Sequence, residues 1–341
     1  MKSVYVTAPY NYAVLDTEIP ELKDDYEVLI QMKASGVCGS DFHLYHGKNP
    51  NSTYPRIPGH ENAGIIRRVG RKVTKVKVGD HIVIDLIISC GECYQCRTGR
   101  ENVCEKVKVR GSGTDGGWRE FLIAAEDDVY IVPKDIPIEY AALIEPYAIG
   151  AHCTTRGRVV SDDIVFILGV GTIGTIIMQT CKAKGCTVIA CDINSEILNR
   201  AEELGVDSII NSRNEKVVER VQEITGGKGV SVAFDSACYH GSLTSLFEQG
   251  LVRNAGRIVS LGFVTEPEKI SQAMLNIREL DLIGSRMSAY QFMPTIEAFL
   301  QKRYDYEKLV SDFIPFSRID TVFYNMDHPG RDVKKMIITF D

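Results

Sequence analysis

A glycine-rich turn between an apolar strand and a helix constrains the fold of this chain more than any other feature. Gly169, Gly171 and Gly174 form a G-x-G-x-x-G pattern after an apolar run, with Thr172 and Ile173 opening the helix that follows. The first glycine allows a tight turn, the second lets a pyrophosphate approach the backbone, and the third allows the helix to pack closely. These five residues predict a dinucleotide site at the amino end of a helix.

The strand expected after this helix ends in a carboxylate. Asp192 lies 18 residues after Gly174, where it can bind the hydroxyl groups of a ribose. It would repel a 2′-phosphate, and neither Ile193 nor Asn194 supplies a positive charge, so we predict NAD rather than NADP as the cofactor. Alternatively, Asp192 caps the helix that follows, which does not exclude binding of the ribose.

The pattern of the sequence divides the chain into two domains, as its 341 residues lead us to expect. Apolar strands alternate with amphipathic helices from about 162 to 287, which predicts a doubly wound parallel sheet. Short β-type runs separated by Gly, Pro, Asp and Asn precede this region and predict a mostly antiparallel domain. We predict an α/β protein in which residues 1–149 and 288–341 form one domain and residues 150–287 form the other.

Composition and charge exclude several classes of protein. With 44% hydrophobic and 25% charged residues, the chain has the composition of an ordinary globular protein. Its net charge of -6 argues against nucleic acid as a partner. The first residues lack the charged and apolar segments of a secretion signal, and no apolar run approaches the roughly 18 residues of a membrane span. We expect a cytoplasmic protein without a membrane partner.

Four of the ten cysteines are clustered within residues 90–104. Two-residue spacers let neighbouring cysteines turn back onto one metal ion, and four thiolates are a ligand set that zinc prefers in structural sites. A bacterial iron–sulfur run would place its fourth cysteine after three residues and before a proline, unlike Cys104. Two disulfides or four unrelated core thiols are alternatives. The predicted ligands of a structural zinc are Cys90, Cys93, Cys96 and Cys104.

Four further residues could form a second, open metal site. Cys38 and His60 each lie in a glycine-rich turn, Glu61 follows His60, and Glu145 is a carboxylate within an apolar stretch. A buried carboxylate is costly without a cation or a donor, and three protein ligands with one exchangeable position are typical of catalytic zinc. Each residue alone has a simpler explanation, because an isolated Cys or His is often a core residue and a Glu before Pro often starts a helix.

Three polar residues follow Cys38 closely. Ser40 could reach a hydroxyl group at the metal, Asp41 could hold a metal-bound imidazole through its free ring N–H, and His43 could pass a proton to solvent. Alternatively, Ser40 or Asp41 caps a helix. The two roles are compatible.

Together, these motifs resemble those of the zinc-containing medium-chain alcohol dehydrogenase family over essentially the whole chain. The motifs that carry the resemblance are G-V-C-G-S-D-x-H, G-H-E-x-x-G, the four-cysteine segment, D-G-G-W-R-E-F (with Trp118 where the family usually has Phe), E-P-x-A-x-G-x-H and G-x-G-x-x-G. The Glu after His60 and the E-P pair at 145 are similar to the branch of sorbitol, threonine and sugar-acid dehydrogenases. I-P-G-H-E and the G-S-R at 284–286 are similar to L-galactonate or L-gulonate 5-dehydrogenases.

The resemblance implies a GroES-like, mostly antiparallel β catalytic domain interrupted by a Rossmann domain. It implies that Cys38, His60 and Glu145 bind the catalytic zinc, with Glu61 able to replace one of them or a water. Each chain would hold two zinc ions and NAD. A homo-oligomer, either a dimer or a tetramer, is implied as well.

The resemblance also assigns a proton relay to Ser40 and His43 and makes Asp41 the partner of the zinc-bound histidine. The implied activity is hydride transfer between NAD and a secondary alcohol of a polyol or sugar acid. A hexonate such as L-galactonate or L-gulonate, oxidised to a keto acid, is the first candidate substrate. A sorbitol-type polyol and L-threonine are the alternatives.

Three residues could recognise the carboxylate of a sugar acid. They are Arg119, Arg286 and Tyr290, since arginine binds carboxylates in a bidentate manner. Equally, Arg119 could be a surface residue and Arg286 could pair with a buried acid such as Glu145.

Two other functions are compatible with parts of the sequence. A zinc-free reductase on the same scaffold would need neither Cys38 nor His60. A non-enzymatic regulator could use the cysteine segment as a nucleic-acid-binding zinc module, although scattered basic residues usually form a solvated face. The residues that support this second function are Arg97, Arg100, Lys106, Lys108 and Arg110.

Overall fold

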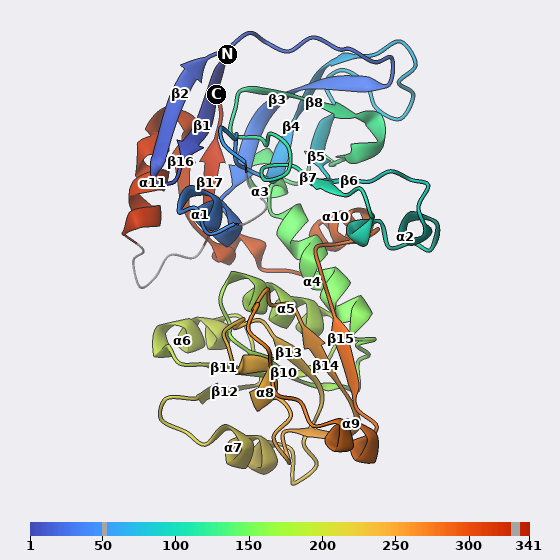
Figure 1. Ribbon diagram of the computed structural model, residues 1–341, viewed down its shortest axis with the longest axis vertical. Coiled ribbons are helices and arrows are strands. Elements are labelled where there is room, and N and C mark those ends of the chain that lie inside the picture. The colour runs from blue at the N-terminus through green and yellow to red at the C-terminus, as the bar shows by residue number, and fades with distance from the viewer. Residues whose placement is uncertain (50–52, 329–334) are drawn as a thin grey trace. The chain divides into compact units, whose positions relative to one another are not determined.

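The chain folds into two compact units, both visible in Figure 1. The computed structural model describes residues 1–49, 53–328 and 335–341. The first unit consists of Met1–Glu145, Phe292–Lys302 and Tyr306–Asp341, and the second consists of Pro146–Gln291 and Arg303–Asp305.

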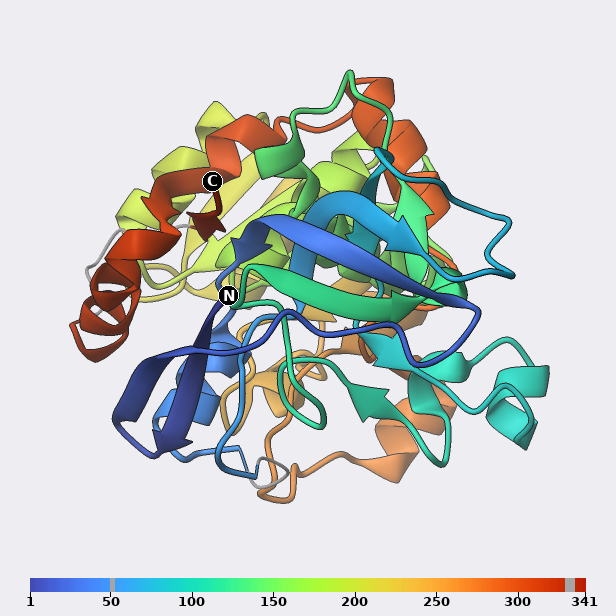
Figure 2. The same cartoon turned by 90° about the horizontal axis from the view of Figure 1, so that it is seen from above.

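A seven-stranded sheet is the framework of the first unit. In sheet order its strands are β16 (Val310–Pro315), β17 (Lys335–Thr339), β3 (Glu27–Gly36), β4 (Glu61–Val69), β5 (His81–Ile84) and β9 (Val129–Ile131), with β8 (Phe121–Ala125) also paired to β3. In Figure 2 the long blue strand β3 lies between the lighter blue β4 and the green β8. Every pair is antiparallel except β16 with β17. The predicted mostly antiparallel domain is confirmed.

Two small ribbons and several short helices complete the first unit. The ribbons are β1 (Lys2–Ala8) with β2 (Asn11–Asp16), and β6 (Ile87–Ile88) with β7 (Lys108–Val109). The helices are α1 (Gly39–Tyr45), α2 (Tyr94–Arg97), α3 (Ile138–Ala141), α10 (Phe292–Leu300) and α11 (Ile319–Asp327). Helix α4 (Ile144–Arg156) begins in the first unit and continues into the second.

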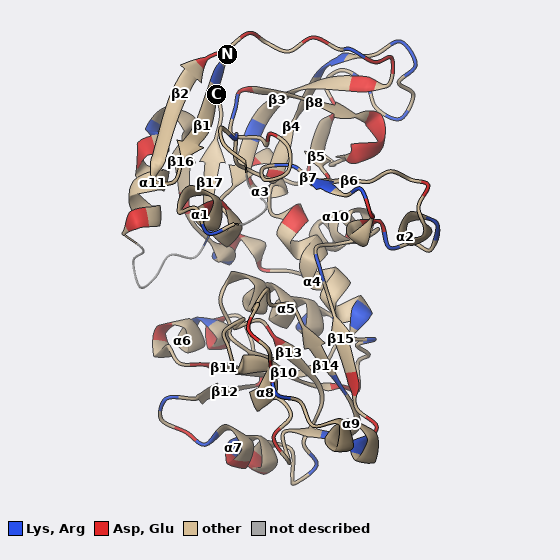
Figure 3. Cartoon of the chain, in the orientation of Figure 1, with Lys and Arg blue, Asp and Glu red and all other residues tan. Residues whose placement is uncertain are grey.

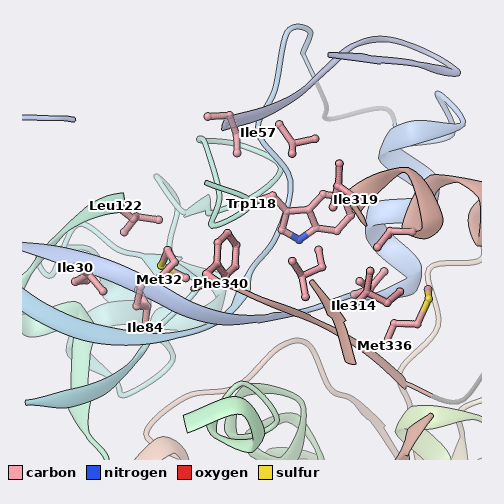
Figure 4. Packing of buried hydrophobic residues seen from close by; sticks show 14 of the residues in the cluster. Ile30, Met32, Ile57, Ile84, Trp118, Leu122, Ile314, Ile319, Met336 and Phe340 are labelled. Carbon is pink, nitrogen blue, oxygen red and sulfur yellow. The ribbon is translucent and has the colours of Figure 1, made fainter. Parts of the chain in front are cut away.

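The core of the first unit fixes one of the turns that carry polar side chains. Alternation along β3 buries Ile30 and Met32 in the same apolar cluster as Trp118, as Figure 4 shows. Trp118 is fully buried and lies against Gly59, where an added Cβ would be 2.2 Å from Trp118 Cδ1. Because Gly59 also has a φ of +90°, only glycine fits this position immediately before His60.

The second unit is built on a six-stranded parallel sheet. In sheet order its strands are β12 (Ser208–Asn211), β11 (Thr187–Asp192), β10 (Ile164–Leu168), β13 (Val230–Asp235), β14 (Val252–Ser260) and β15 (Asp281–Gly284). The helices between them are α5 (Thr172–Ala183), α6 (Ser195–Glu203), α7 (Val217–Ile224), α8 (Ser242–Ser245) and α9 (Gln272–Arg278). This strand order is that of a doubly wound dinucleotide-binding fold, so the predicted Rossmann-type sheet is confirmed.

Each face of this parallel sheet is covered by its own apolar cluster. Neighbouring residues of β10 alternate between the clusters, because Ile167 belongs to one and Phe166 to the other. Helix α5 contributes Cys181 to the first cluster, and helix α7 contributes Val221 to the second. Strands buried on both faces explain the continuous apolar runs in this part of the sequence.

The charged residues are distributed without long blocks of one sign. In Figure 3, basic and acidic residues are interspersed along the elements of both units. Within the described ranges, no helix has both the length and the apolar character needed to cross a membrane.

Candidate active site

Three side chains of the first unit point their ligand atoms at one another. Cys38 precedes α1, His60 precedes β4, and Glu61 is the first residue of β4. One ligand atom from each lies within 4.8 Å of the others. His60 and Glu61 are buried, with exposed fractions of 9% and 1%. A thiol, an imidazole and a carboxylate in this arrangement can bind one zinc ion.

Asp41 accepts hydrogen bonds from both turns that carry the ligand residues of this cluster. Its carboxylate accepts hydrogen bonds from the amide of Cys38 at 2.9 Å and from the amide of Gly59 at 3.2 Å, and it lies 3.8 Å from His60 Nδ1. Burial lowers the pKa of His60, but the charges of Asp41 and Cys38 outweigh it and raise that pKa well above its ordinary value. Asp41 is thus placed to orient the imidazole, as predicted for a partner of a metal-bound histidine.

Glu145 is a buried carboxylate without a partner among the described residues. It is 1% exposed, and neither of its oxygens has a hydrogen-bond donor in that part of the chain. Burial raises its pKa well above the ordinary value, while the charge of His60 acts in the opposite direction. Glu145 is not one of the three residues whose ligand atoms lie within 4.8 Å of one another. The charges of His60, Glu61 and Cys38 nevertheless act on its carboxylate. A buried, orphaned carboxylate that interacts electrostatically with these ligands fits a site that is completed by a cation.

Lys335 is a residue of this site that sequence reasoning missed. It is 2% exposed, and its ammonium group donates hydrogen bonds to Glu61 and, at 3.0 Å, to the carbonyl of Val37. Gly36 provides the space for the Glu61 carboxylate, because an added Cβ would lie 1.9 Å from Glu61 Oε2. The only signal in the sequence is a lysine at the start of the apolar run MIITF.

Ser40 and His43 lie on the exposed side of α1. They are three residues apart on a helix, so they share one face, and both are accessible to solvent. Asp41 and Leu44 are on the buried side of the same helix. This orientation is compatible with passing a proton outwards, and the predicted relay remains a proposal.

The four-cysteine segment forms a second cluster. Its sulfur atoms lie within 4.8 Å of one another, all four thiols are free rather than paired in disulfides, and Cys104 accepts amide hydrogen bonds from Cys90 and Lys106. Backbone hydrogen bonds, that from Cys96 first, lower the pKa of Cys93 to about 6. Two disulfides and four unrelated thiols, which the sequence left open, are not what the structure shows.

The basic residues beside this cluster do not share one solvated face. Lys106 pairs with Glu92 at 3.0 Å, and Arg110 is buried against Asp128. Figure 3 shows acidic residues among the basic ones around α2. This pattern weakens the regulator hypothesis, since a nucleic-acid interface needs a basic surface.

The glycine-rich turn of the second unit has the expected geometry. Gly169 has a φ of +84°, and a Cβ on Gly174 would lie 2.0 Å from the Gly169 carbonyl oxygen, so both positions need glycine. A Cβ on Gly171 would meet nothing within 4 Å. Open space at the middle glycine, before Thr172 and Ile173 begin α5, fits the close approach of a ligand.

Asp192 lies at the carboxyl end of β11, beside this turn. Its carboxylate accepts hydrogen bonds from the amides of Val170 at 2.9 Å and Asn194 at 3.0 Å. The alternative in which Asp192 caps the next helix is wrong, because the side chain of Asn194 caps α6 by accepting from Glu196. The cap is thus two positions later, because α6 begins at Ser195 rather than directly after β11.

The three residues predicted to bind substrate are in different units. Arg119 lies in the first unit and is half-buried; burial lowers its pKa, and the charge of Asp115 acts in the opposite direction. Arg286 and Tyr290 are exposed residues of the second unit. Their contact with a substrate remains a proposal.

Known proteins resemble the chain over its length. Residues 24–134 match the family model of the alcohol dehydrogenase GroES-like domain, and residues 172–302 match that of zinc-binding dehydrogenases. Starvation-sensing protein RspB of Escherichia coli K12 is 33% identical, covering 100% of this chain and 99% of that protein. Sorbitol dehydrogenase of Bacillus subtilis 168 is 32% identical over 86% of this chain and 84% of that protein.

A solved structure resembles the chain equally closely. The crystal structure of the alcohol dehydrogenase rspB from E. coli CFT073, a complex with NADH, matches with a TM-score of 0.94 and 32% identity, covering 100% of this chain and 99% of that one. The family expected from the motifs is confirmed. The chain belongs to the zinc-binding dehydrogenases of the medium-chain alcohol dehydrogenase family.

Proposed function

We propose that this enzyme transfers a hydride between NAD and a secondary alcohol of a polyol or sugar acid, with a zinc ion at the cluster of Cys38, His60 and Glu61. The observation that carries the proposal is that these three ligand atoms lie within 4.8 Å of one another, while the orphaned carboxylate of Glu145 is subject to the charges of the same residues. The NADH complex of the rspB dehydrogenase supports the choice of cofactor.

Cys38, His60 and one of the two carboxylates, Glu61 or Glu145, would hold this zinc. A bound zinc ion lowers the pKa of a hydroxyl group beside it, and NAD accepts a hydride. Lys335 already neutralises part of the charge of Glu61, whereas Glu145 has no such partner. Glu145 therefore gains more from a cation, and Glu61 is the carboxylate that would exchange with it.

The remaining residues of α1 would handle the proton. Asp41 would orient His60, because the amides of Cys38 and Gly59 hold its carboxylate 3.8 Å from His60 Nδ1. Ser40 would take the proton of the substrate hydroxyl and His43 would release it to solvent, since both are on the exposed face of α1. Protein side chains thus would provide a path for one proton in each turnover.

The four-cysteine cluster would hold a second zinc ion with a structural role. Four thiolates complete a tetrahedral shell, so this position offers no room for substrate or water. The first turn of α5, with Gly169, Gly171 and Gly174, would bind the pyrophosphate, and Asp192 the adenosine ribose.

The substrate class is proposed from the similarity to sorbitol dehydrogenase and from the arginines. A hexonate such as L-galactonate or L-gulonate is the first candidate, because Arg119 and Arg286, with Tyr290, could bind its carboxylate. Sorbitol-type polyols and L-threonine are the alternatives. We also propose a homo-oligomer, a dimer or tetramer, which light scattering would test.

A substrate screen combined with metal analysis tests this proposal. NADH formation is measured with hexitols, aldonates and L-threonine, and the zinc content of the same preparation is determined. We expect activity with at least one of these classes and two zinc ions per chain. A zinc-free protein that reduces or oxidises the same substrates would instead be the zinc-free reductase.

A further inference from the structure

Helix α5 ends in a turn that brings two cysteines together. The amide of Cys186 donates a hydrogen bond to the carbonyl of Cys181 at 3.1 Å, and Lys184 donates to the same carbonyl. Gly185 has a φ of +86°, so the chain reverses in a left-handed residue after the helix. In this type of helix end, the two residues joined by the outer hydrogen bond place their side chains in contact.

The side chains of Cys181 and Cys186 are buried together in one apolar cluster. Both side chains lie in the apolar cluster on one face of the parallel sheet, and their exposed fractions are 0% and 2%. Cys186 Sγ also lies 3.2 Å from the carbonyl oxygen of Val160. Cys191, the next cysteine along the chain, belongs to the cluster on the opposite face of the parallel sheet. The sheet therefore separates it from Cys181.

We infer that Cys181 and Cys186 form a redox modification site, in which a small hydroperoxide converts these two neighbouring thiols into an intramolecular disulfide. The Cys186 sulfur attacks the peroxide, which breaks the O–O bond and forms a sulfenic acid and one water molecule or alcohol. The sulfur of Cys181 then attacks that of Cys186, and the sulfenic oxygen leaves as water. The two thiols lose two electrons and two protons, and the peroxide gains them.

The environment assigns the first step to Cys186. The neighbouring Cys181 side chain lowers the pKa of Cys186, whereas Cys186 and burial raise the pKa of Cys181. A thiolate reacts faster with peroxide than a thiol does. Because both residues are buried, the oxidant must be small.

The site is distinct from the proposed dinucleotide site. Gly171 caps the amino end of α5, and Cys181 lies in its last turn. The disulfide would link the carboxyl end of α5 to the start of β11, so it leaves the glycine-rich turn unchanged. Its formation does not depend on the proposed function.

Peptide mapping of the intact protein tests the inference. The protein is treated with hydrogen peroxide, alkylated under denaturing conditions without reductant, and digested with trypsin. Cleavage at Arg158, Lys182, Lys184 and Arg200 separates the two cysteines into peptides 159–182 and 185–200. We expect these peptides to appear as one disulfide-linked species that dithiothreitol splits.

Three variants identify the sulfur atoms. Cys181→Ala and Cys186→Ala should each abolish the linked species, whereas Cys191→Ala, which changes the second cysteine of peptide 185–200, should retain it. A linked species that survives in Cys186→Ala would overturn the assignment. So would recovery of both thiols in alkylated form at a peroxide concentration that oxidises the exposed thiol of Cys238, or a sulfinic acid at Cys186 without any linked species.

Discussion

The buried ammonium group of Lys335 donates a hydrogen bond to Glu61, joining the last strand of the sheet to a ligand candidate 274 positions earlier in the chain. Both side chains are nearly inaccessible, at 3% and 1% exposure. Burial lowers the pKa of Lys335, but the charges of Glu61 and Cys38 raise it above the ordinary value, so the lysine stays charged. The ammonium group of Lys335 therefore offsets the negative charge of Glu61 before any cation binds.

Replacing Lys335 should damage both the fold and the metal site. Lys335→Met leaves Glu61 buried without its partner, which costs about 3–5 kcal/mol of the free energy of unfolding. Lys335→Arg keeps the charge and should restore part of this loss, and Lys77→Met, at an exposed lysine of the same unit, should change nothing. Urea denaturation measures these differences. Equal stability of Lys335→Met and Lys77→Met would show that the pair contributes nothing.

Substitutions of two glycines in the same turn should have different effects, one on NADH binding and the other on thermal stability. A Cβ at Gly171 enters open space, so Gly171→Val should fold normally but weaken NADH binding by at least tenfold, about 1.4 kcal/mol. A Cβ at Gly174 collides with the Gly169 carbonyl, so Gly174→Val should lower the Tm. Fluorescence titration with NADH and thermal unfolding measure the two effects. Unchanged NADH affinity in Gly171→Val would place the dinucleotide elsewhere.

Asp85 should make the folded state less stable as the pH rises. Burial raises the pKa of Asp85 from 3.8 to about 7, so between these values the folded protein binds a proton that the unfolded chain has released. The contribution of Asp85 to the free energy of unfolding therefore falls from about pH 4 to pH 7 and is level above that range. Asp85→Asn should be more stable than the wild type at pH 8, on the order of a few kcal/mol, with no difference near pH 3.

The control for Asp85 is an exposed carboxylate. Asp162→Asn should leave the free energy of unfolding unchanged at both pH values. Urea denaturation at pH 3, 5 and 8 gives the comparison. A wild-type protein whose stability rises from pH 5 to pH 8 in parallel with Asp85→Asn would contradict the prediction.

The four-cysteine cluster should stabilise the fold and take no part in catalysis. Cys93→Ala removes one of four thiolates, so we expect one zinc fewer per chain, a lower Tm and reduced solubility. The control is Cys153→Ala, at a buried cysteine that belongs to neither group of metal ligands, and this variant should retain its zinc. Thermal unfolding and atomic absorption measure these quantities. An unchanged melting curve together with unchanged zinc content would refute the structural role.

Local motifs made part of this protein predictable from its sequence. The G-x-G-x-x-G turn and the cluster from Cys90 to Cys104 each depend on residues that are near in the chain, so their geometry follows from spacing. Cys38 and His60 come from separate turns, and the sequence alone left each with a simpler role. Their assignment as one site depended on the resemblance to a family.

Long-range contacts account for what the sequence did not predict. Lys335 is buried beside Glu61 only because β17 pairs with the end of β3, and a lysine before an apolar run gives no sign of this. The cap of α6 was assigned to Asp192 as one alternative, whereas Asn194 has that role because the turn after β11 is longer. The raised pKa of Asp85 likewise depends on burial that only the folded chain creates.

Cys38→Ala tests the central claim most directly, through the zinc content and the turnover of one purified variant. The variant should remain folded and bind NADH, lose about one zinc per chain, and show no NADH formation with the substrate found in the screen. Retained turnover, or a zinc content equal to that of the wild type, would contradict the assignment of a catalytic zinc to Cys38, His60 and the carboxylates beside them.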